Sequence, residues 1–93
     1  MTRDSLNVAV AALIATLYDI GEPHEAIETL AYMALQSVDA NTYTLDAYTS
    51  IVGIMVKAKL IDQRYGKLVL TDEGIKLGKK LEESLTEARH GQA

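Results

Sequence analysis

The residues best suited to acid–base or metal chemistry lie close together in the first third of the chain. His24 stands between Glu22 and Glu25, with Glu28 nearby. An imidazole beside carboxylates suits a general base or a metal ligand. The only other histidine is His90, far away in the sequence, and the chain contains no cysteine. A solvated first turn of a helix explains this group better, so we expect no catalytic residue, no metal site and no cofactor.

Other residue types that perform catalysis are present without the spacing that catalysis needs. No serine lies in the Gly-x-Ser-x-Gly setting of a hydrolase. The segment from Gly74 to Lys80 contains glycines and lysines, but it lies in a predicted helix and lacks the spacing of a phosphate-binding loop. The sequence therefore predicts a protein that is not an enzyme.

Positive charge is concentrated in one segment of an acidic chain. The net charge is −4, and residues 1–56 carry a single basic residue, Arg3. Lysine and arginine outnumber acidic residues only in residues 57–80. Nucleic-acid-binding domains are usually basic overall, so only this segment suits contacts with phosphates. An ordinary solvated surface with scattered charge is the alternative explanation.

Hydrophobic periodicity predicts four helices and one β-hairpin in these 93 residues. The predicted ranges are a helix over 5–20, a helix over 23–38, a helix over 44–59, a hairpin over 60–70 and a helix that follows residue 71. Ser5, Thr44 and Thr71 are the expected N-caps, and Pro23 suits the first position of the second helix. The first helix is apolar on most sides, which is typical of a helix that is central or packs on a second molecule.

Length and composition indicate one domain. We expect residues 1–88 to form a single, mainly α domain with a small hairpin, and residues 89–93 to form a flexible C-terminal tail. No apolar run reaches the roughly 18–20 residues needed to span a bilayer, and the N-terminal stretch lacks the features of a signal peptide. We therefore expect a cytoplasmic protein.

The segment around the hairpin resembles the winged helix-turn-helix regulators of the MarR-like and PadR-like kind. Leu60-Ile61 precede a short hairpin, and the residues from Leu70 to Gly74 match the Leu-Thr-x-x-Gly pattern of these families. Lys59 stands where the families usually have glycine. The resemblance implies a winged helix-turn-helix with the order α-α-α-β-β-α, in which the third helix enters the major groove of DNA.

Under this interpretation the protein is a DNA-binding regulator of transcription that acts as a dimer. Thr49 and Ser50 would contact bases, and the basic residues of the third helix and the wing would contact phosphates. The complete set of expected nucleic-acid contacts is Thr44, Thr49, Ser50, Lys57, Lys59, Arg64, Tyr65 and Lys67.

A second interpretation is a protein–protein interaction module, such as an adaptor or a phage-type inhibitor, that has the same fold and does not bind DNA. The third helix has no arginine, and Asp46 on it would repel phosphate. Apolar residues beyond the needs of a small core would then form a homodimer or partner interface, unless they fill the core of the monomer. The expected interface residues are Val8, Ala12, Ile14, Ile54, Val56, Leu77, Leu81 and Leu85.

Overall fold

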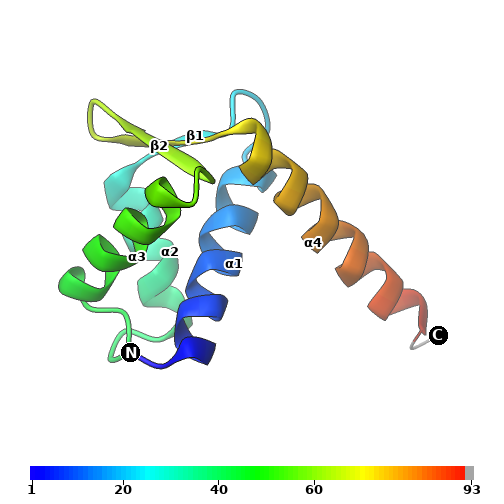
Figure 1. Ribbon diagram of the computed structural model, residues 1–93. Helices are drawn as coiled ribbons and strands as arrows, with labels where there is room; N and C mark the ends of the chain where they lie inside the picture. Colours follow the sequence, from blue (N-terminus) through cyan, green and yellow to red (C-terminus); the bar gives the residue numbers. More distant parts are fainter. Residues whose placement is uncertain (92–93) are drawn as a thin grey trace.

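The computed structural model describes the backbone of residues 1–91 and the side chains of residues 1–88. In chain order the elements are α1 (Arg3–Asp19), β1 (Glu25–Ile27), α2 (Glu28–Val38), α3 (Leu45–Lys57), β2 (Ile61–Arg64), β3 (Lys67–Leu70) and α4 (Asp72–Gly91) (Figure 1). The protein is mainly helical with one small antiparallel sheet, which confirms the predicted fold class, and the order fits a winged-helix layout. The side chains of the tail predicted at 89–93 lie outside the described residues, and α4 is assigned through Gly91.

Helix α1 occupies the centre of the molecule, as its apolar surface predicts. It contacts α2, α3, α4 and β3, and its fully buried Leu13, Ile14 and Leu17 form the middle of the core. Ile14 was expected at an interface, but it is 0% exposed and belongs to the core of the single chain. The helix also begins earlier than expected, because the side chain of Thr2 rather than that of Ser5 caps it, at 3.0 Å from the Ser5 amide nitrogen.

The segment before α2 corrects the prediction of a helix that starts at Pro23. Pro23 lies in a turn, the next three residues form β1, and α2 begins only at Glu28. Strand β1 pairs antiparallel with β3, with Ala26 opposite Leu68. The Leu70 amide donates to the His24 carbonyl oxygen at 3.0 Å, which extends this pairing beyond β1. Because the backbone of this segment bonds to β3, it cannot also start a helix.

The sheet has the order β1-β3-β2, and the β2–β3 hairpin forms the wing. A two-residue turn, Tyr65-Gly66, joins the strands, and both residues have positive φ angles, of 52° and 75°. Such angles belong to the tight hairpin turn expected from Gly66, because its twist matches that of the strands. The wing extends from the helical body on the side of α3 (Figure 1).

A tight junction fixes the start of α4. The Thr71 hydroxyl donates to the Lys59 carbonyl oxygen and accepts from the Gly74 amide at 3.1 Å, so Thr71 caps α4 as predicted. Gly74 lies against the backbone of Leu60. Lys59 has a φ of 62°, a left-handed conformation that glycine adopts without strain.

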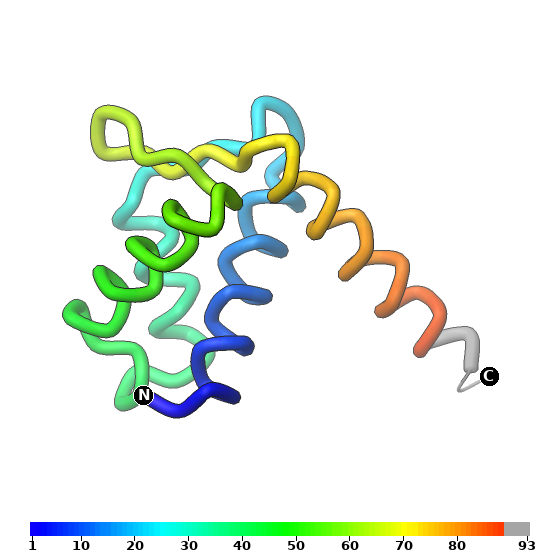
Figure 2. The backbone as a smooth tube through the Cα atoms, viewed as in Figure 1, coloured from blue at the N-terminus to red at the C-terminus, as the bar shows by residue number. Residues whose placement is uncertain are grey.

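Beyond this junction α4 diverges from the body of the protein (Figure 2). Gly78 packs on the ring of Tyr18, and Leu77 and Leu81 are partly buried, but residues 82–88 are all exposed. Of the helices described, none has both the length and the apolar character that crossing a membrane requires.

Candidate nucleic-acid interface

The outer face of α3 is the surface on which the expected base contacts lie. Tyr48, Ile51, Val52 and Met55 turn the inner face of the helix into the core. Thr49 and Ser50 are therefore exposed on the opposite face. The Thr49 hydroxyl donates to the Leu45 carbonyl oxygen at 3.0 Å, which leaves its oxygen free to accept a hydrogen bond from outside.

Thr44 has a local structural role. Its side-chain oxygen accepts a hydrogen bond from the Ala47 amide at 3.3 Å and thereby caps α3. This confirms the predicted N-cap. Because the amide of the first helical turn already engages the hydroxyl, Thr44 contributes to the candidate site mainly by fixing where α3 begins.

The four expected phosphate contacts are all exposed, but they fall into two groups. Lys57 and Lys59 lie at the C-terminal end of α3, beside the base of the wing, whereas Arg64 and Lys67 flank the turn at its tip. A guanidinium nitrogen of Arg64 lies 3.2 Å from a carboxylate oxygen of Asp62, and the Lys67 ammonium lies 3.5 Å from one of Glu25. Exposed ion pairs of this kind contribute only about 0–1 kcal/mol, so a phosphate can compete with either carboxylate.

A hydrogen-bonded cluster around Glu28 lies where α2, α3 and the wing meet. One carboxylate oxygen of Glu28 accepts from the Tyr48 hydroxyl at 3.1 Å and from the Gln63 side-chain amide at 3.0 Å. Burial raises the pKa of the Tyr48 hydroxyl, and the neighbouring negative charge of Glu28 raises it further. Tyr48 therefore stays protonated and holds Glu28 between α2 and α3.

The Glu28 cluster forms one wall of a groove between the N-terminal ends of α2 and α3. The groove has a volume of about 330 Å³, and its lining residues are Glu28, Thr29, Tyr32, Leu45, Tyr48 and Thr49. Leu45 is 60% exposed, and Asp46 next to it is also exposed. This end of the candidate interface is consequently acidic and partly apolar.

The place of Glu25 and Glu28 on this surface was not predicted from the sequence. Both residues were expected in the first turn of a helix, whereas Glu25 is in β1 and Glu28 is the first residue of α2. Within β1 only Ala26 is buried, and the three residues of this strand are too few to give a periodic signal in the sequence. The surface expected to attract phosphate therefore mixes its four basic residues with the carboxylates of Glu25, Glu28, Asp46 and Asp62.

Tyr65 is the one aromatic residue that the wing presents to solvent. It sits at the tip of the wing, and its side chain is fully exposed. Tyr43 and Tyr48, by contrast, are buried, and the Tyr43 hydroxyl donates to the Ser5 carbonyl oxygen at 2.7 Å. Only Tyr65 of these three is available to stack on a base or to contact a sugar.

The expected interface residues do not form one surface. Val8 on α1, Ile54 on α3 and Leu85 on α4 are exposed. The others, apart from the buried Ile14, are partly buried and pack against the core: Ala12, Val56, Leu77 and Leu81. Ile54 lies on the candidate nucleic-acid face, whereas Val8 and Leu85 lie on the side of α1 and α4.

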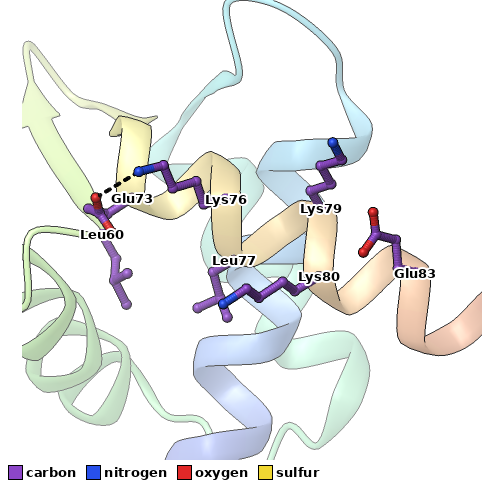
Figure 3. Close-up of a pocket in the computed structure, with 7 residues that line it drawn as sticks. All are labelled: Leu60, Glu73, Lys76, Leu77, Lys79, Lys80 and Glu83. Carbon is purple, nitrogen blue, oxygen red and sulfur yellow. Dashed lines mark hydrogen bonds and ion pairs between the residues drawn. The ribbon is translucent and has the colours of Figure 1, made fainter.

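The lysines of α4 line a separate open groove of about 490 Å³ (Figure 3). Its lining residues are Leu60, Glu73, Lys76, Leu77, Lys79, Lys80 and Glu83. The Lys76 ammonium lies 3.4 Å from a carboxylate oxygen of Glu73, and the lysine ammonium groups point in different directions (Figure 3). The groove thus lacks the convergent donors of an anion site. Among the described residues, no three His, Cys, Asp or Glu side chains are grouped in a way that would hold a metal ion.

The order of helices and strands fits a small winged-helix layout, and the exposed faces of α3 and the wing form the candidate interface. Comparison of the chain with protein-family models, with curated protein sequences and with solved structures found no match.

Proposed function

We propose that the protein is a non-enzymatic regulator that binds duplex DNA through α3 and the wing. The observation that supports this function best is that the outer face of α3 and the wing are exposed side by side (Figure 1). A helix with this arrangement fits the major groove, and a wing beside it reaches the adjacent backbone. The proposal follows the resemblance to winged helix-turn-helix regulators and includes the cytoplasmic location expected from the sequence.

In this proposal the hydroxyls of α3 read bases and the wing holds phosphates. Thr49 acts as an acceptor, because its hydroxyl hydrogen is engaged by the Leu45 carbonyl, so it suits the exocyclic amino group of cytosine or adenine. Arg64 and Lys67 exchange their carboxylate partners for phosphates. Few groups read bases directly, so sequence preference depends partly on the shape of the DNA.

Binding to a random-sequence duplex across a salt series tests this function. We expect the logarithm of the association constant to fall linearly with the logarithm of salt concentration, by about 0.9 for each phosphate contacted. Fluorescence anisotropy of a labelled duplex measures this slope. The absence of binding at about 50 mM salt, where electrostatic attraction is strong, would contradict the proposal.

A matched pair of arginine variants tests whether the wing contacts the DNA. Arg64→Ala removes a guanidinium from the wing, and Arg3→Ala removes one from the N-terminus of α1, which lies at the opposite end of the body (Figure 1). We expect Arg64→Ala to weaken binding and to make the salt slope shallower by about 1, and Arg3→Ala to leave the slope unchanged. Equal effects of the two variants would indicate attraction without a defined interface.

Asp46→Asn tests whether α3 itself approaches the DNA. Asp46 is exposed in the first turn of α3, where its charge repels phosphate. If α3 enters the groove, this variant should bind severalfold more tightly at low salt and only slightly more tightly at high salt. An unchanged affinity would place the DNA away from the N-terminal end of α3.

A protein-binding role without DNA is the second candidate function. It is favoured by the exposed Leu45 and Ile54 on α3 and by the carboxylates of Glu28 and Asp46 beside them. Apolar side chains ringed by charge are typical of protein interfaces. If DNA binding fails in the salt series, capture experiments with Leu45→Ser as the negative control test this alternative.

A further inference from the structure

The outer face of α2 is apolar and carries no charge. Its residues follow the spacing i, i+3, i+4, i+7 and i+8, which places them on one side of the helix, and they are Leu30, Met33, Ala34, Ser37 and Val38. Leu30 is 45% exposed, Met33 is 58% exposed and Val38 is 51% exposed. The polar side chain on this face, Ser37, donates its hydroxyl hydrogen to the Met33 carbonyl oxygen at 3.0 Å. The outer face of α2 therefore presents mainly apolar contacts to solvent.

The core of the chain already covers the opposite side of α2. Ala31 and Leu35 are fully buried, and the partly buried ring of Tyr32 packs edge-on against that of Tyr48, with 5.5 Å between the ring centroids. Apolar residues on both sides are typical of a helix that is covered on both sides. Within one chain only the inner side is covered, so the outer face of α2 has the features of a contact surface for another molecule.

The charges around this face indicate the chemistry of the partner. Residues 4–56 include α2 and most of α1 and α3, and they contain no lysine or arginine. Their acidic residues are Asp4, Asp19, Glu22, Glu25, Glu28, Asp39 and Asp46. Near the N-terminal end of α2, the one basic neighbour is Lys67 on β3, the strand partner of Ile27, and Glu25 already pairs with it. The surroundings of α2 are therefore negatively charged.

The C-terminal end of α2 is the most clearly negative part of these surroundings. Asp39 is the C-cap residue, and no basic residue in the last turn offsets the negative end of the helix dipole. The Thr42 hydroxyl donates to the Asp39 carboxylate at 2.8 Å, and this hydrogen bond lowers the pKa of the Asp39 carboxyl from its usual value. The carboxylate next to Val38 therefore stays ionised at neutral pH.

These charges disfavour several molecules that could otherwise cover an apolar face. A second copy of the chain would bring its own acidic surroundings against them, with like charges at both ends of α2. The phosphates of nucleic acid and of an anionic lipid surface would be repelled in the same way. A protein segment that combines an apolar stripe with basic residues is complementary to both features of the face.

We propose that the outer face of α2 is the docking site for an amphipathic helix of a partner protein, with basic residues on both sides of its apolar stripe. Its apolar side chains pack among Leu30, Met33 and Val38, and its lysines or arginines lie beside Asp39 and the other carboxylates around α2. Met33 favours such a contact, because its unbranched side chain adapts to the shape of a partner. The face excludes the α2 residues that line the groove beside α3, so the proposal does not depend on DNA binding.

Two synthetic peptides test the chemistry of the partner. Both are helical, about 18 residues long, and carry leucines at i, i+3, i+4 and i+7. One has lysines beside the leucine stripe, and the other has glutamates at the same positions. Fluorescence anisotropy of the labelled peptides measures binding to the wild-type protein. At about 50 mM salt we expect the lysine peptide to bind at least about tenfold more tightly, and at about 500 mM this difference should shrink.

A matched pair of variants tests the apolar contact. Met33 is 58% exposed on α2, and Leu85 is 59% exposed on α4. Met33→Ser should weaken binding of the lysine peptide at least about tenfold, because the complex loses buried apolar area. Leu85→Ser should leave the affinity unchanged. Circular dichroism checks that both variants remain folded.

A second pair of variants tests the charge at the end of α2. Asp39→Asn keeps a side-chain oxygen that can accept from the Asn41 amide, as the Asp39 carboxylate does at 3.0 Å, and it removes the charge. It should weaken binding of the lysine peptide severalfold at low salt and have little effect at high salt. Glu83→Gln removes an exposed carboxylate from α4 and should have no effect at either salt concentration.

Four results would overturn the proposal. They are no binding of the lysine peptide, equal binding of the two peptides at low salt, equal effects of Met33→Ser and Leu85→Ser, and a larger loss with Leu45→Ser than with Met33→Ser, which would place the peptide on α3. Sedimentation equilibrium of the protein alone adds one more: self-association that Met33→Ser abolishes would mean that a second copy covers the face. Because the peptides bind without DNA present, failure of DNA binding in the salt series leaves these results unaffected.

Discussion

The two halves of α4 are held in opposite ways. In the inner half, Gly74 lies against the backbone of Leu60 and Gly78 lies against the ring of Tyr18. In the outer half, residues 82–88 are exposed, and Leu85 faces an open groove. The fold of one chain therefore explains where α4 starts and in which direction it runs, but it leaves the apolar stripe on the outer half of α4 exposed.

Substitution of Gly74, in the inner half of α4, should destabilise the protein severely. A Cβ atom at this position would lie 2.2 Å from the Leu60 carbonyl oxygen, which is backbone and cannot rotate away. We expect Gly74→Ala to lower the free energy of unfolding by about 3 kcal/mol or more, as measured by urea denaturation.

Gly53 on α3 provides the matched control for Gly74. Apart from its chain neighbours and the backbone of its own helix, nothing lies within 4 Å of the position that its Cβ would occupy. Gly53→Ala should therefore stabilise the protein by about 0.5–1 kcal/mol, because alanine is the better helix former. A similar effect of the two substitutions would show that the α4 junction is looser than described.

Ile14 on α1 is buried and Leu85 on α4 is exposed, so truncation of the two side chains should affect stability differently. Ile14 is fully buried, so Ile14→Ala should lower the free energy of unfolding by about 2–5 kcal/mol. Leu85→Ala should change it by less than about 0.5 kcal/mol at concentrations where the chain is a monomer. A large loss with Leu85→Ala in the monomer would mean that the outer half already packs within one chain.

The hydrogen bonds that cap α4 should stabilise the protein less than the close packing at Gly74 does. Thr71→Ala removes both the bond to the Lys59 carbonyl and the bond from the Gly74 amide, and it should cost about 0.5–2 kcal/mol in urea denaturation. Thr71→Ser keeps the hydroxyl and should restore most of that loss. If serine were no better than alanine, the hydroxyl would not be the stabilising group.

A modest gain in stability is expected at Lys59, the residue that precedes Leu60 and the wing. Lys59 holds a φ of 62°, a conformation that glycine adopts without strain, so Lys59→Gly should stabilise the protein by about 1 kcal/mol. Lys57→Gly removes the same charge from the last turn of α3 and should destabilise by a similar amount. Thermal unfolding of the two variants should therefore shift in opposite directions.

Local signals in the sequence were sufficient to predict most of the helices and the hairpin. Periodicity located the helices, and Thr44, Gly66 and Thr71 marked where α3 begins, where the wing turns and where α4 begins. Each of these features depends on residues within one or two turns of each other. The outer face of α3 followed from the same periodicity, so the exposure of Thr49 and Ser50 was predictable as well.

Features that depend on distant partners were not predictable in the same way. Strand β1 is three residues long, too short for a periodic signal, and its partner β3 lies about forty residues away in the chain. Missing β1 also misplaced Glu25 and Glu28, and with them the acidic part of the candidate interface. Ile14 was misassigned because the sequence shows that a helix is apolar on most sides without showing which side faces α4.

The pairing of β1 with β3 also sets an order of events during synthesis. Ala26 has no strand partner until Leu68 has been made, so the sheet closes only after α1, α2 and α3 have all emerged. The core residues of these helices can gather first through shorter-range contacts, since helices form faster than pairings between distant strands. Closure of the sheet, and the docking of Gly74 on Leu60 that depends on residues made later still, therefore come late in the synthesis of the chain.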